Sequence, residues 1–238
     1  MKEIEFTGEF MIPGKSGHRI EQDHISRYEF AGYHAAGRSV LDIACGYGYG
    51  APIMLRAGAR CYTGIDINHD LITNARSQHS DPKITYEVGD IRKYKPSKEG
   101  FDLVLCFETI EHIPFYKEAI RNLYRMLSSD GLLIISSPNR PVTSPGSKNI
   151  TDKPLNKFHT QEFTIKELSD ALKNEGFIIL KDGLFGQRLS WFYTKNQLIT
   201  RIRNRLIGNP MVYSNSYPKK IILKQPAYFI ILAKKLDS

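Results

Sequence analysis

The chain has 238 residues, 41% of them hydrophobic, with 33 Lys and Arg against 25 Asp and Glu, which gives a net charge of +8. This length suits one substantial core, so we interpret residues 1–238 as a single domain. No leader-like start is seen, and no apolar run approaches the roughly 18 residues of a membrane span, so a cytoplasmic protein is expected. The positive charge favours anionic partners, although solvated basic faces are equally common.

Residues 1–37 are expected to form an N-terminal cover, in which a loop containing Pro and Gly leads into a helix over 19–36. Beyond this cover, short apolar runs alternate with helical patterns, which indicates right-handed βαβ units and an open parallel sheet. We expect five strands, over 39–44, 61–66, 84–88, 101–106 and 132–136. We expect helices over 51–57, from a cap at Asn68 or Asp70 to residue 76, and over 114–127.

The second part of the chain is less regular. Residues 138–160 hold four prolines and predict a long functional loop. Thr164 and Glu167 form a capping box, which predicts a helix to residue 174. Two further strands are expected over 177–184 and 227–234. The domain therefore divides into the cover, a core over 38–185, a variable insertion over 186–226 and a last strand within 227–238.

The most informative segment is 40–50, with the sequence VLDIACGYGYG. Apolar residues lead into alternating glycines and then a helix, which predicts a strand, a tight turn and a helix whose first N–H groups face a ligand. Asp66 ends the next strand about twenty residues later, where a ribose-binding carboxylate is expected. Two cofactor classes remain open, because Gly46, Gly48 and Ala51 also fit the dinucleotide pattern of a nicotinamide oxidoreductase.

The spacing D-x-x-x-G-x-G-x-G from Asp42 resembles motif I of the class I S-adenosylmethionine (SAM) methyltransferases. Gly89-Asp90-Ile91 resembles their adenine-binding turn, and ETIEHI over 108–113 resembles the Glu-His-Ile that follows the fourth strand in small-molecule enzymes. The resemblance implies a Rossmann-like α/β fold. The implied fold has a seven-stranded, mostly parallel sheet with helices on both faces. It also has an N-terminal helical cover and a C-terminal insertion before an antiparallel last strand.

The resemblance also implies SAM as the cofactor. The residues expected to bind it lie in the cover helix, in the glycine turn and at the ends of strands. They are Tyr28, Asp42, Ala44, Gly46, Gly48, Asp66, Ile67, Asp90, Ile91, Phe107 and His112. Arg27 is a candidate partner of the methionine carboxylate or a solvated helix arginine, and His18 and His24 are candidates to face the pocket.

FTGEFMIP over 6–13 and FHTQEFTIKEL over 158–168 resemble bacterial methyltransferases of saccharide and natural-product pathways, although Phe10 stands where that group often has Arg. The implied reaction is methyl transfer to a hydroxyl of a saccharide or related small molecule. The alternatives are N-methylation of an amino sugar and esterification of a carboxylate, phosphate or phosphonate. A nucleic-acid methyltransferase is the other class, and it is not favoured because no RNA-binding module is recognisable.

A neutral hydroxyl acceptor needs a general base, whereas an anionic acceptor does not. The catalytic candidates are His159, His112 and Glu108, with Glu111 nearby. No metal site is expected, because the sequence has no His/Cys cluster at ligand spacing and no Asp-rich loop. The basic amphipathic stretch 196–207 suits packing, dimer formation, contact with an anionic membrane, or recognition of a nucleotide- or lipid-linked acceptor.

Overall fold

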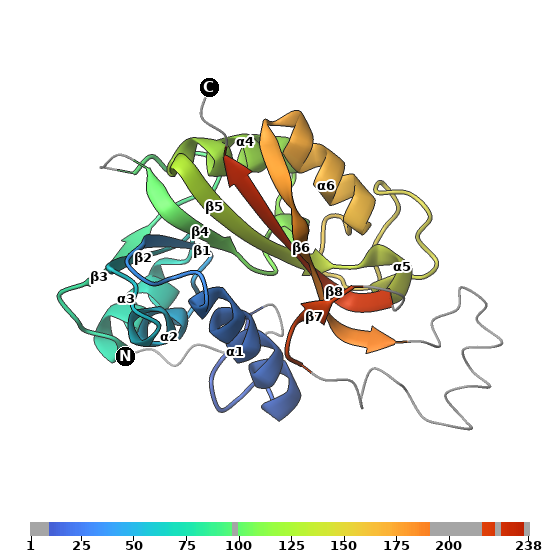
Figure 1. Cartoon of the computed structure of the whole chain (residues 1–238). Helices are drawn as coiled ribbons and strands as arrows, with labels where there is room; N and C mark the ends of the chain where they lie inside the picture. Colours follow the sequence, from blue (N-terminus) through green and yellow to red (C-terminus); the bar gives the residue numbers. More distant parts are fainter. Residues whose placement is uncertain (1–9, 97–99, 191–215, 222–224, 236–238) are drawn as a thin grey trace.

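The computed structural model describes residues 10–96, 100–190, 216–221 and 225–235 (Figure 1). Eight strands form one sheet in the order β3-β2-β1-β4-β5-β8-β6-β7. β1 to β5 pair in parallel, whereas β8 runs antiparallel to both β5 and β6. The strands are β1 (Ser39–Ile43), β2 (Cys61–Asp66), β3 (Ile84–Val88), β4 (Phe101–Cys106), β5 (Leu127–Pro138), β6 (Phe177–Ser190), β7 (Lys219–Lys220) and β8 (Gln225–Lys235).

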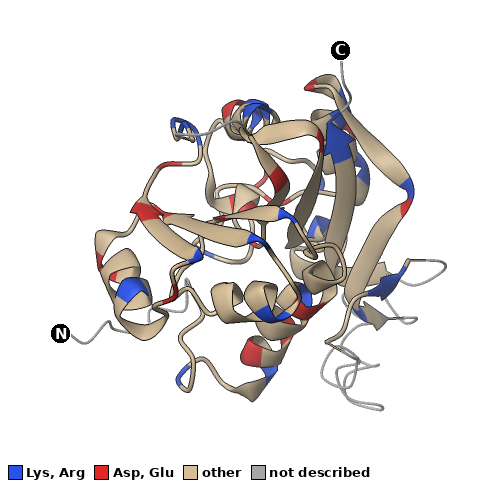
Figure 2. Ribbon diagram, turned by 60° about the vertical axis from the view of Figure 1, so that its left-hand side comes forward, with Lys and Arg blue, Asp and Glu red and all other residues tan. Residues whose placement is uncertain are grey.

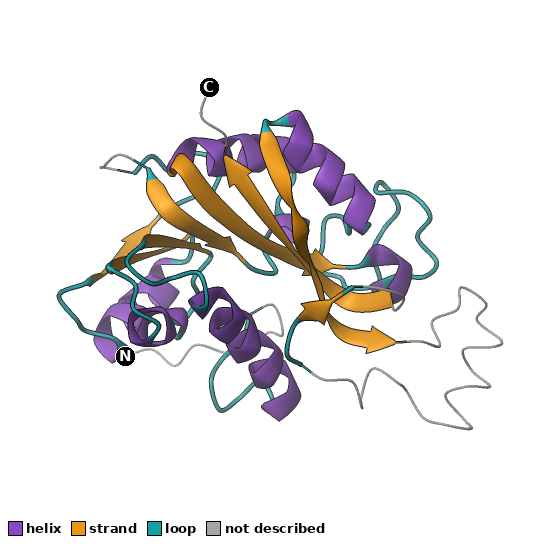
Figure 3. Cartoon of the chain, viewed as in Figure 1, coloured by secondary structure: helices purple, strands orange, loops and turns teal. Residues whose placement is uncertain are grey.

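Helices cover the sheet on both faces, so the molecule has three layers (Figure 3). One apolar cluster joins α1, α2 and α3 to one face, and a second joins α4 and α6 to the other. The helices are α1 (His18–Gly32), α2 (Gly50–Arg56), α3 (His69–Gln78), η1 (Ile110–His112), α4 (Tyr116–Met126), α5 (Arg140–Thr143) and α6 (Ile165–Asn174).

Local sequence signals set several of these elements. All five residues of β1 are buried, as expected for an apolar strand covered on both faces. The Asn68 side chain caps α3 by accepting from the N–H groups of Asp70 and Leu71. Thr164 and Glu167 form the expected capping box at the start of α6.

The α/β architecture with an antiparallel last strand is confirmed, and the sheet has one strand more than the seven expected. The additional strand is the two-residue β7, in which Lys219 and Lys220 pair with the β6 residues Gly186 and Phe185. β6 continues to Ser190, beyond the expected end at residue 184, because β8 pairs with it along this length. The expected loop over 138–160 contains the short helix α5.

β5 is also longer than the strand expected over 132–136, because it starts at Leu127. Pairing with β4 begins at Leu127 opposite Phe101 and resumes, after an irregularity, at Leu132 opposite Leu103. At its other end, β8 extends the strand to Pro138.

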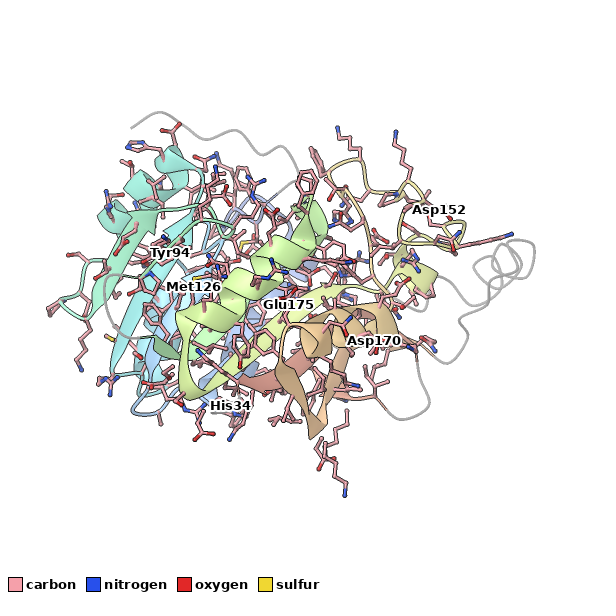
Figure 4. All side chains as sticks on the ribbon, turned by 90° about the horizontal axis from the view of Figure 1, so that it is seen from above. His34, Tyr94, Met126, Asp152, Asp170 and Glu175 are labelled. Atoms are coloured by element: carbon pink, nitrogen blue, oxygen red, sulfur yellow. The ribbon has the colours of Figure 1, made fainter. Side chains whose placement is uncertain are left out.

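Basic and acidic residues are interspersed over the described ribbon (Figure 2). One ion pair links the two helices on the same face of the sheet, where Arg121 of α4 donates to the Glu175 carboxylate at 3.0 Å. Glu175 is labelled beside α4 in Figure 4. Among the described residues, no helix has the length and apolar character that crossing a membrane requires. The basic stretch 196–207 lies outside the described residues.

Candidate functional site

The site lies where the strand order reverses. β1 and β4 are neighbours in the sheet, but their following helices cover opposite faces, and ligands of open α/β sheets bind in the crevice at such a point. The residues just after the two strands, Ala44 and Glu108, have φ values of +55° and +48°. Such left-handed backbone is uncommon in non-glycine residues and clusters at functional sites. Both residues are among those predicted from sequence.

The glycine turn after β1 combines open space with close packing. A Cβ built on Gly46, which has φ +56°, would meet no atom within 4 Å. By contrast, a Cβ on Gly50 would run into the ring of Tyr28. The turn therefore leaves open space beside Gly46, while α1 packs tightly against the start of α2. Gly48 is buried, and its carbonyl accepts from the Tyr86 hydroxyl at 3.0 Å.

Asp66 connects the end of β2 to the glycine turn. One carboxylate oxygen accepts from the Gly46 N–H at 3.0 Å, and the other accepts from the Asn68 N–H at 2.9 Å. The next residue, Ile67, is 69% exposed and presents an apolar side chain beside this acid. A flat aromatic ligand lying against Ile67 would cover this surface.

Asp90 follows β3 and is held by Arg92. The Arg92 guanidinium donates to both carboxylate oxygens, at 2.7 Å to Oδ2 and 3.1 Å to Oδ1, and this pairing lowers the pKa of Asp90. Ile91 beside it is buried in the core that contains α4. Asp66 and Asp90 thus stand at the ends of neighbouring parallel strands, β2 and β3, as the sequence predicts.

Asp42 lies within β1, as its motif predicts, and its side chain is held by two tyrosines. Its side chain is fully buried and accepts from the hydroxyls of Tyr28 and Tyr62, whereas Oδ1 has no hydrogen-bond partner among the described residues. Burial raises its pKa to about 7, although the tyrosine hydrogen bonds oppose the rise. Asp42 therefore positions Tyr28, whose ring packs edge-on against Phe107 at 5.3 Å.

A polar network reaches the crevice from α1 and β6. Buried Arg27 donates from Nε to Gln187 at 2.7 Å, its Nη2 lies 3.5 Å from Glu108 Oε2, and its Nη1 has no hydrogen-bond partner among the described residues. Glu108 also accepts from the Ser136 hydroxyl at 2.7 Å. Sequence reasoning missed Gln187 and Ser136. Ser136 could have been predicted as a site residue, because it lies near the carboxyl end of a parallel strand. Gln187 has no comparable signal in the sequence.

The cover histidines occupy two different environments. His24 is partly buried, with Nδ1 3.0 Å from the Tyr49 hydroxyl. Burial and the nearby Arg27 charge lower the pKa of His24 to about 3, so the ring is neutral at physiological pH. His18 is exposed at the start of α1, where its ring lies 2.9 Å from the Gln22 amide nitrogen.

A second polar group, which we call the Glu-His-His cluster, consists of Glu111, His112 and His159. One potential ligand atom from each residue lies within 4.8 Å of the others. Glu111 is fully buried, and neither carboxylate oxygen has a hydrogen-bond partner among the described residues. Burial and the neighbouring Glu108 raise its pKa well above the ordinary value.

Backbone and side-chain hydrogen bonds build this cluster from two distant segments. His112 Nδ1 lies 3.0 Å from the carbonyl oxygen of Phe158, and the rings of His112 and His159 pack edge-on at 4.9 Å. His159 Nδ1 lies 2.7 Å from a carboxylate oxygen of Glu162. The sequence predicted the two histidines individually and no metal-ligand cluster, because the two residues are far apart in the chain.

Comparison with known proteins identifies the family. The family model described as a methyltransferase domain matches residues 18–181. A Mycolicibacterium smegmatis protein named "Probable S-adenosylmethionine-dependent methyltransferase" is 31% identical over 175 residues. The match covers 73% of this chain and 65% of that protein, so the chain spans less than two thirds of this relative's length.

Two further proteins agree with this match. A ubiquinone biosynthesis O-methyltransferase of Coxiella burnetii is 31% identical over 106 residues, which are 44% of this chain and 45% of that protein. The solved structure of an S-adenosylmethionine-dependent methyltransferase from Mesorhizobium loti has a TM-score of 0.60 at 18% identity. It covers 89% of this chain and 96% of that chain, and it shows the fold.

The residues around the glycine turn offer the kinds of group that SAM requires. Open space over Gly46 admits a ligand, Asp66 and Asp90 offer carboxylates at neighbouring strand ends, and exposed Ile67 offers an apolar surface. The buried Nη1 of Arg27, unpartnered among the described residues, offers a donor for a carboxylate. The chain belongs to the S-adenosylmethionine-dependent methyltransferases of class I fold, and SAM is the cofactor of this family.

Proposed function

We propose that this protein transfers the methyl group of SAM to a hydroxyl oxygen of a small molecule, most specifically a saccharide or related metabolite. The observation that carries the hydroxyl assignment is the orientation of His159. Its Nδ1 faces the buried carboxylate of Glu162, which can only accept, so Nδ1 holds the proton and Nε2 holds the lone pair. A histidine oriented in this way by a carboxylate is the arrangement of a general base.

Glu162 is itself held as an anion. Burial alone would raise its pKa, but hydrogen bonds from His159, Thr143 and Ser144 bring it below the ordinary value. The Thr143 hydroxyl donates at 2.5 Å. An ionised Glu162 stabilises His159 after it has accepted a proton, which is the role a general base requires of its partner.

SAM, when bound, supplies a methyl group made electrophilic by the adjacent sulfonium. We propose that it is held by the glycine turn at Ala44, Gly46 and Gly48, by Asp66 and by Asp90, with Ile67 and Ile91 at the adenine. Tyr28, Phe107 and His112 would surround the methionine end, and Asp42 would act by fixing Tyr28. Holding the reactants in line is expected to contribute about 7–11 kcal/mol to the lowering of the barrier.

The cofactor site is tested by calorimetric titration. SAM and S-adenosylhomocysteine are expected to bind, and NAD and NADP are not. Asp66→Ala and Asp90→Ala should each weaken SAM binding by about 1–3 kcal/mol, the cost of losing a hydrogen bond to a charged group. Asp182→Ala removes an exposed carboxylate of β6 and serves as the control. Unchanged SAM affinity in both site variants would contradict the assignment.

The acceptor is tested by mass spectrometry of a pool of saccharides and related metabolites incubated with the protein and isotopically labelled SAM. Label is expected on oxygen, consistent with the name of the Coxiella burnetii relative, an O-methyltransferase. His159→Ala should then lower kcat by about 10²–10⁴-fold with SAM affinity unchanged, and His79→Ala is the matched control. A pH profile that is flat from about 5.5 to 9 would instead identify an already anionic acceptor, which needs no base.

We also propose the chemical class of the acceptor and the contacts that the protein makes with other molecules. An anionic, nucleotide-linked or lipid-linked acceptor is supported by the net charge of +8. Replacing Arg201, Arg203 and Arg205 with Gln should raise the acceptor KM with SAM affinity unchanged. Lost sedimentation with anionic vesicles would indicate membrane contact instead, and a changed sedimentation coefficient would indicate a dimer. A cytoplasmic location is likewise proposed.

A further inference from the structure

We propose that the Glu-His-His cluster is a binding site for a divalent transition-metal ion of the zinc type. Glu111 and His112 come from η1, directly after β4, and His159 comes from the end of the loop that follows α5. Ligand atoms around a tetrahedral ion with bonds of about 2.0–2.1 Å lie about 3.4 Å apart. The three ligand atoms here lie within 4.8 Å of one another. Their separations would therefore shorten by at most about 1.4 Å around an ion.

Glu111 provides the strongest observation. Its carboxylate is fully buried, and both oxygens have no hydrogen-bond partner among the described residues. Buried polar groups are nearly always hydrogen-bonded, and buried charges are paired or coordinate metals. The backbone at Glu111 is fixed, because its carbonyl accepts from Thr160 and Gln161. The side chain is thus held in place by its backbone with its oxygens available to an ion.

The two histidines are oriented as metal ligands usually are. The Phe158 carbonyl can only accept, so His112 Nδ1 carries a proton, and the Glu162 carboxylate fixes the same tautomer in His159. In both rings the lone pair is therefore on Nε2. A ligating histidine almost always donates its other nitrogen to a carboxylate or a carbonyl in this way. Asn156 Nδ2 lies 2.9 Å from His159 Nε2, and an ion would replace that hydrogen bond.

The ligand set selects the kind of ion. Two imidazoles and one carboxylate are the donors of catalytic zinc sites, which keep a further position open, and also suit Mn²⁺ or Fe²⁺. Mg²⁺ prefers an octahedron of oxygens. We do not include Glu108 among the metal ligands. Its carboxylate already accepts a hydrogen bond from Ser136 and lies close to Arg27.

The site stands on these contacts alone, whereas its role rests on the proposed function. An acceptor hydroxyl in the open position would lose its proton to solvent more readily, because a bound cation lowers the pKa of a coordinated hydroxyl. Its oxygen would then form the bond to the methyl carbon as the bond from that carbon to sulfur breaks. In the metal-bound protein, His112 and His159 would act as ligands, and the ion would take over the activation of the hydroxyl that His159 provides in the metal-free protein.

The test is metal binding, measured without acceptor or SAM. Protein freed of metal by chelation and dialysis is titrated with Zn²⁺ in a calorimeter, and with Co²⁺ while the visible spectrum is recorded. The wild type is expected to bind one equivalent of Zn²⁺ and to show Co²⁺ bands of low coordination number. Glu111→Gln, which preserves shape, and His112→Ala and His159→Ala should each weaken binding at least tenfold. His79→Ala, at the end of α3, should not.

The possible results test the metal site and the proposed methyl transfer independently. Absence of Zn²⁺ and Co²⁺ binding by the wild type, or equal affinity of Glu111→Gln and His79→Ala, would overturn the metal site. The spectrum of the wild type decides the question even where an alanine variant fails to fold. Methyl transfer that continues in excess chelator would leave the proposed function standing without the ion. Stoichiometric binding with no methyl transfer to any acceptor would leave the site standing without the proposed function.

Discussion

Asp42→Asn should change how the stability of the protein depends on pH. The Asp42 carboxyl is fully buried, and its pKa rises from an ordinary value of 3.8 to about 7 because burial disfavours the charged form. Each pKa unit corresponds to about 1.36 kcal/mol. The free energy of unfolding is therefore about 4 kcal/mol higher with Asp42 protonated than with Asp42 ionised.

The direction of this pH dependence follows from the protonation of Asp42 in the folded and unfolded chains. Below pH 3.8 the carboxyl is protonated in both folded and unfolded chains, and its favourable contribution is fully present. Between pH 3.8 and about 7 the unfolded chain loses this proton while the folded chain keeps it, so stability falls as pH rises. The amide of the variant has no such proton to lose. The free energy of unfolding of the wild type minus that of Asp42→Asn should therefore decrease by about 4 kcal/mol across this window.

The assay is urea unfolding followed by circular dichroism at a series of pH values from about 4 to 8, which spans most of this window. Asp130→Asn makes the same chemical change at an exposed position in β5 and is the matched control. A difference curve for Asp42→Asn that is flat, or that rises with pH, would refute the assignment of a buried proton to Asp42.

Three further changes probe other parts of the structure. Gly50→Ala should destabilise the protein by about 1–3 kcal/mol in thermal unfolding, because the added Cβ meets the Tyr28 ring; Gly146→Ala, in open space, should not. Thr164→Ala removes the cap of α6 and should cost about 1 kcal/mol in urea unfolding, so an unchanged midpoint would contradict that role. Arg27→Gln should weaken SAM binding at least tenfold in calorimetry, and unaltered affinity would show that its Nη1 does not receive the ligand.

Much of the fold could be predicted because its signals are local. The glycine turn after β1, the Asn68 cap and the Thr164 capping box each depend on residues within a few positions of one another. Asp66 was predicted from its spacing after the glycines, and Asp90 from the resemblance of its turn to that of the family. The structure places both residues at the carboxyl ends of the neighbouring parallel strands β2 and β3. The two-residue strand β7 has no local sequence signal. It forms only because Lys219 and Lys220 pair with the edge of β6.

The parts of the site that the sequence did not predict depend on distant contacts. Asp42 carries the expected motif, but its partners Tyr28 and Tyr62 come from α1 and β2 and bury it. Gln187 lies 160 residues from Arg27, and no spacing rule connects them. The meeting of His112 and His159 likewise depends on how the segment after α5 folds back onto η1.

The position of β8 has a consequence for how the nascent chain folds. This strand, residues 225–235, separates β5 from β6 and pairs with both, so these two strands share no backbone hydrogen bond of their own. While the ribosome synthesises the chain in order, β5 therefore has an unpaired edge from the time residue 138 emerges until β8 follows. Such an edge is a ready template for pairing with another chain. Co-translational folding of this protein thus leaves a long interval in which protection of β5 by a chaperone, or by faster elongation, would limit aggregation.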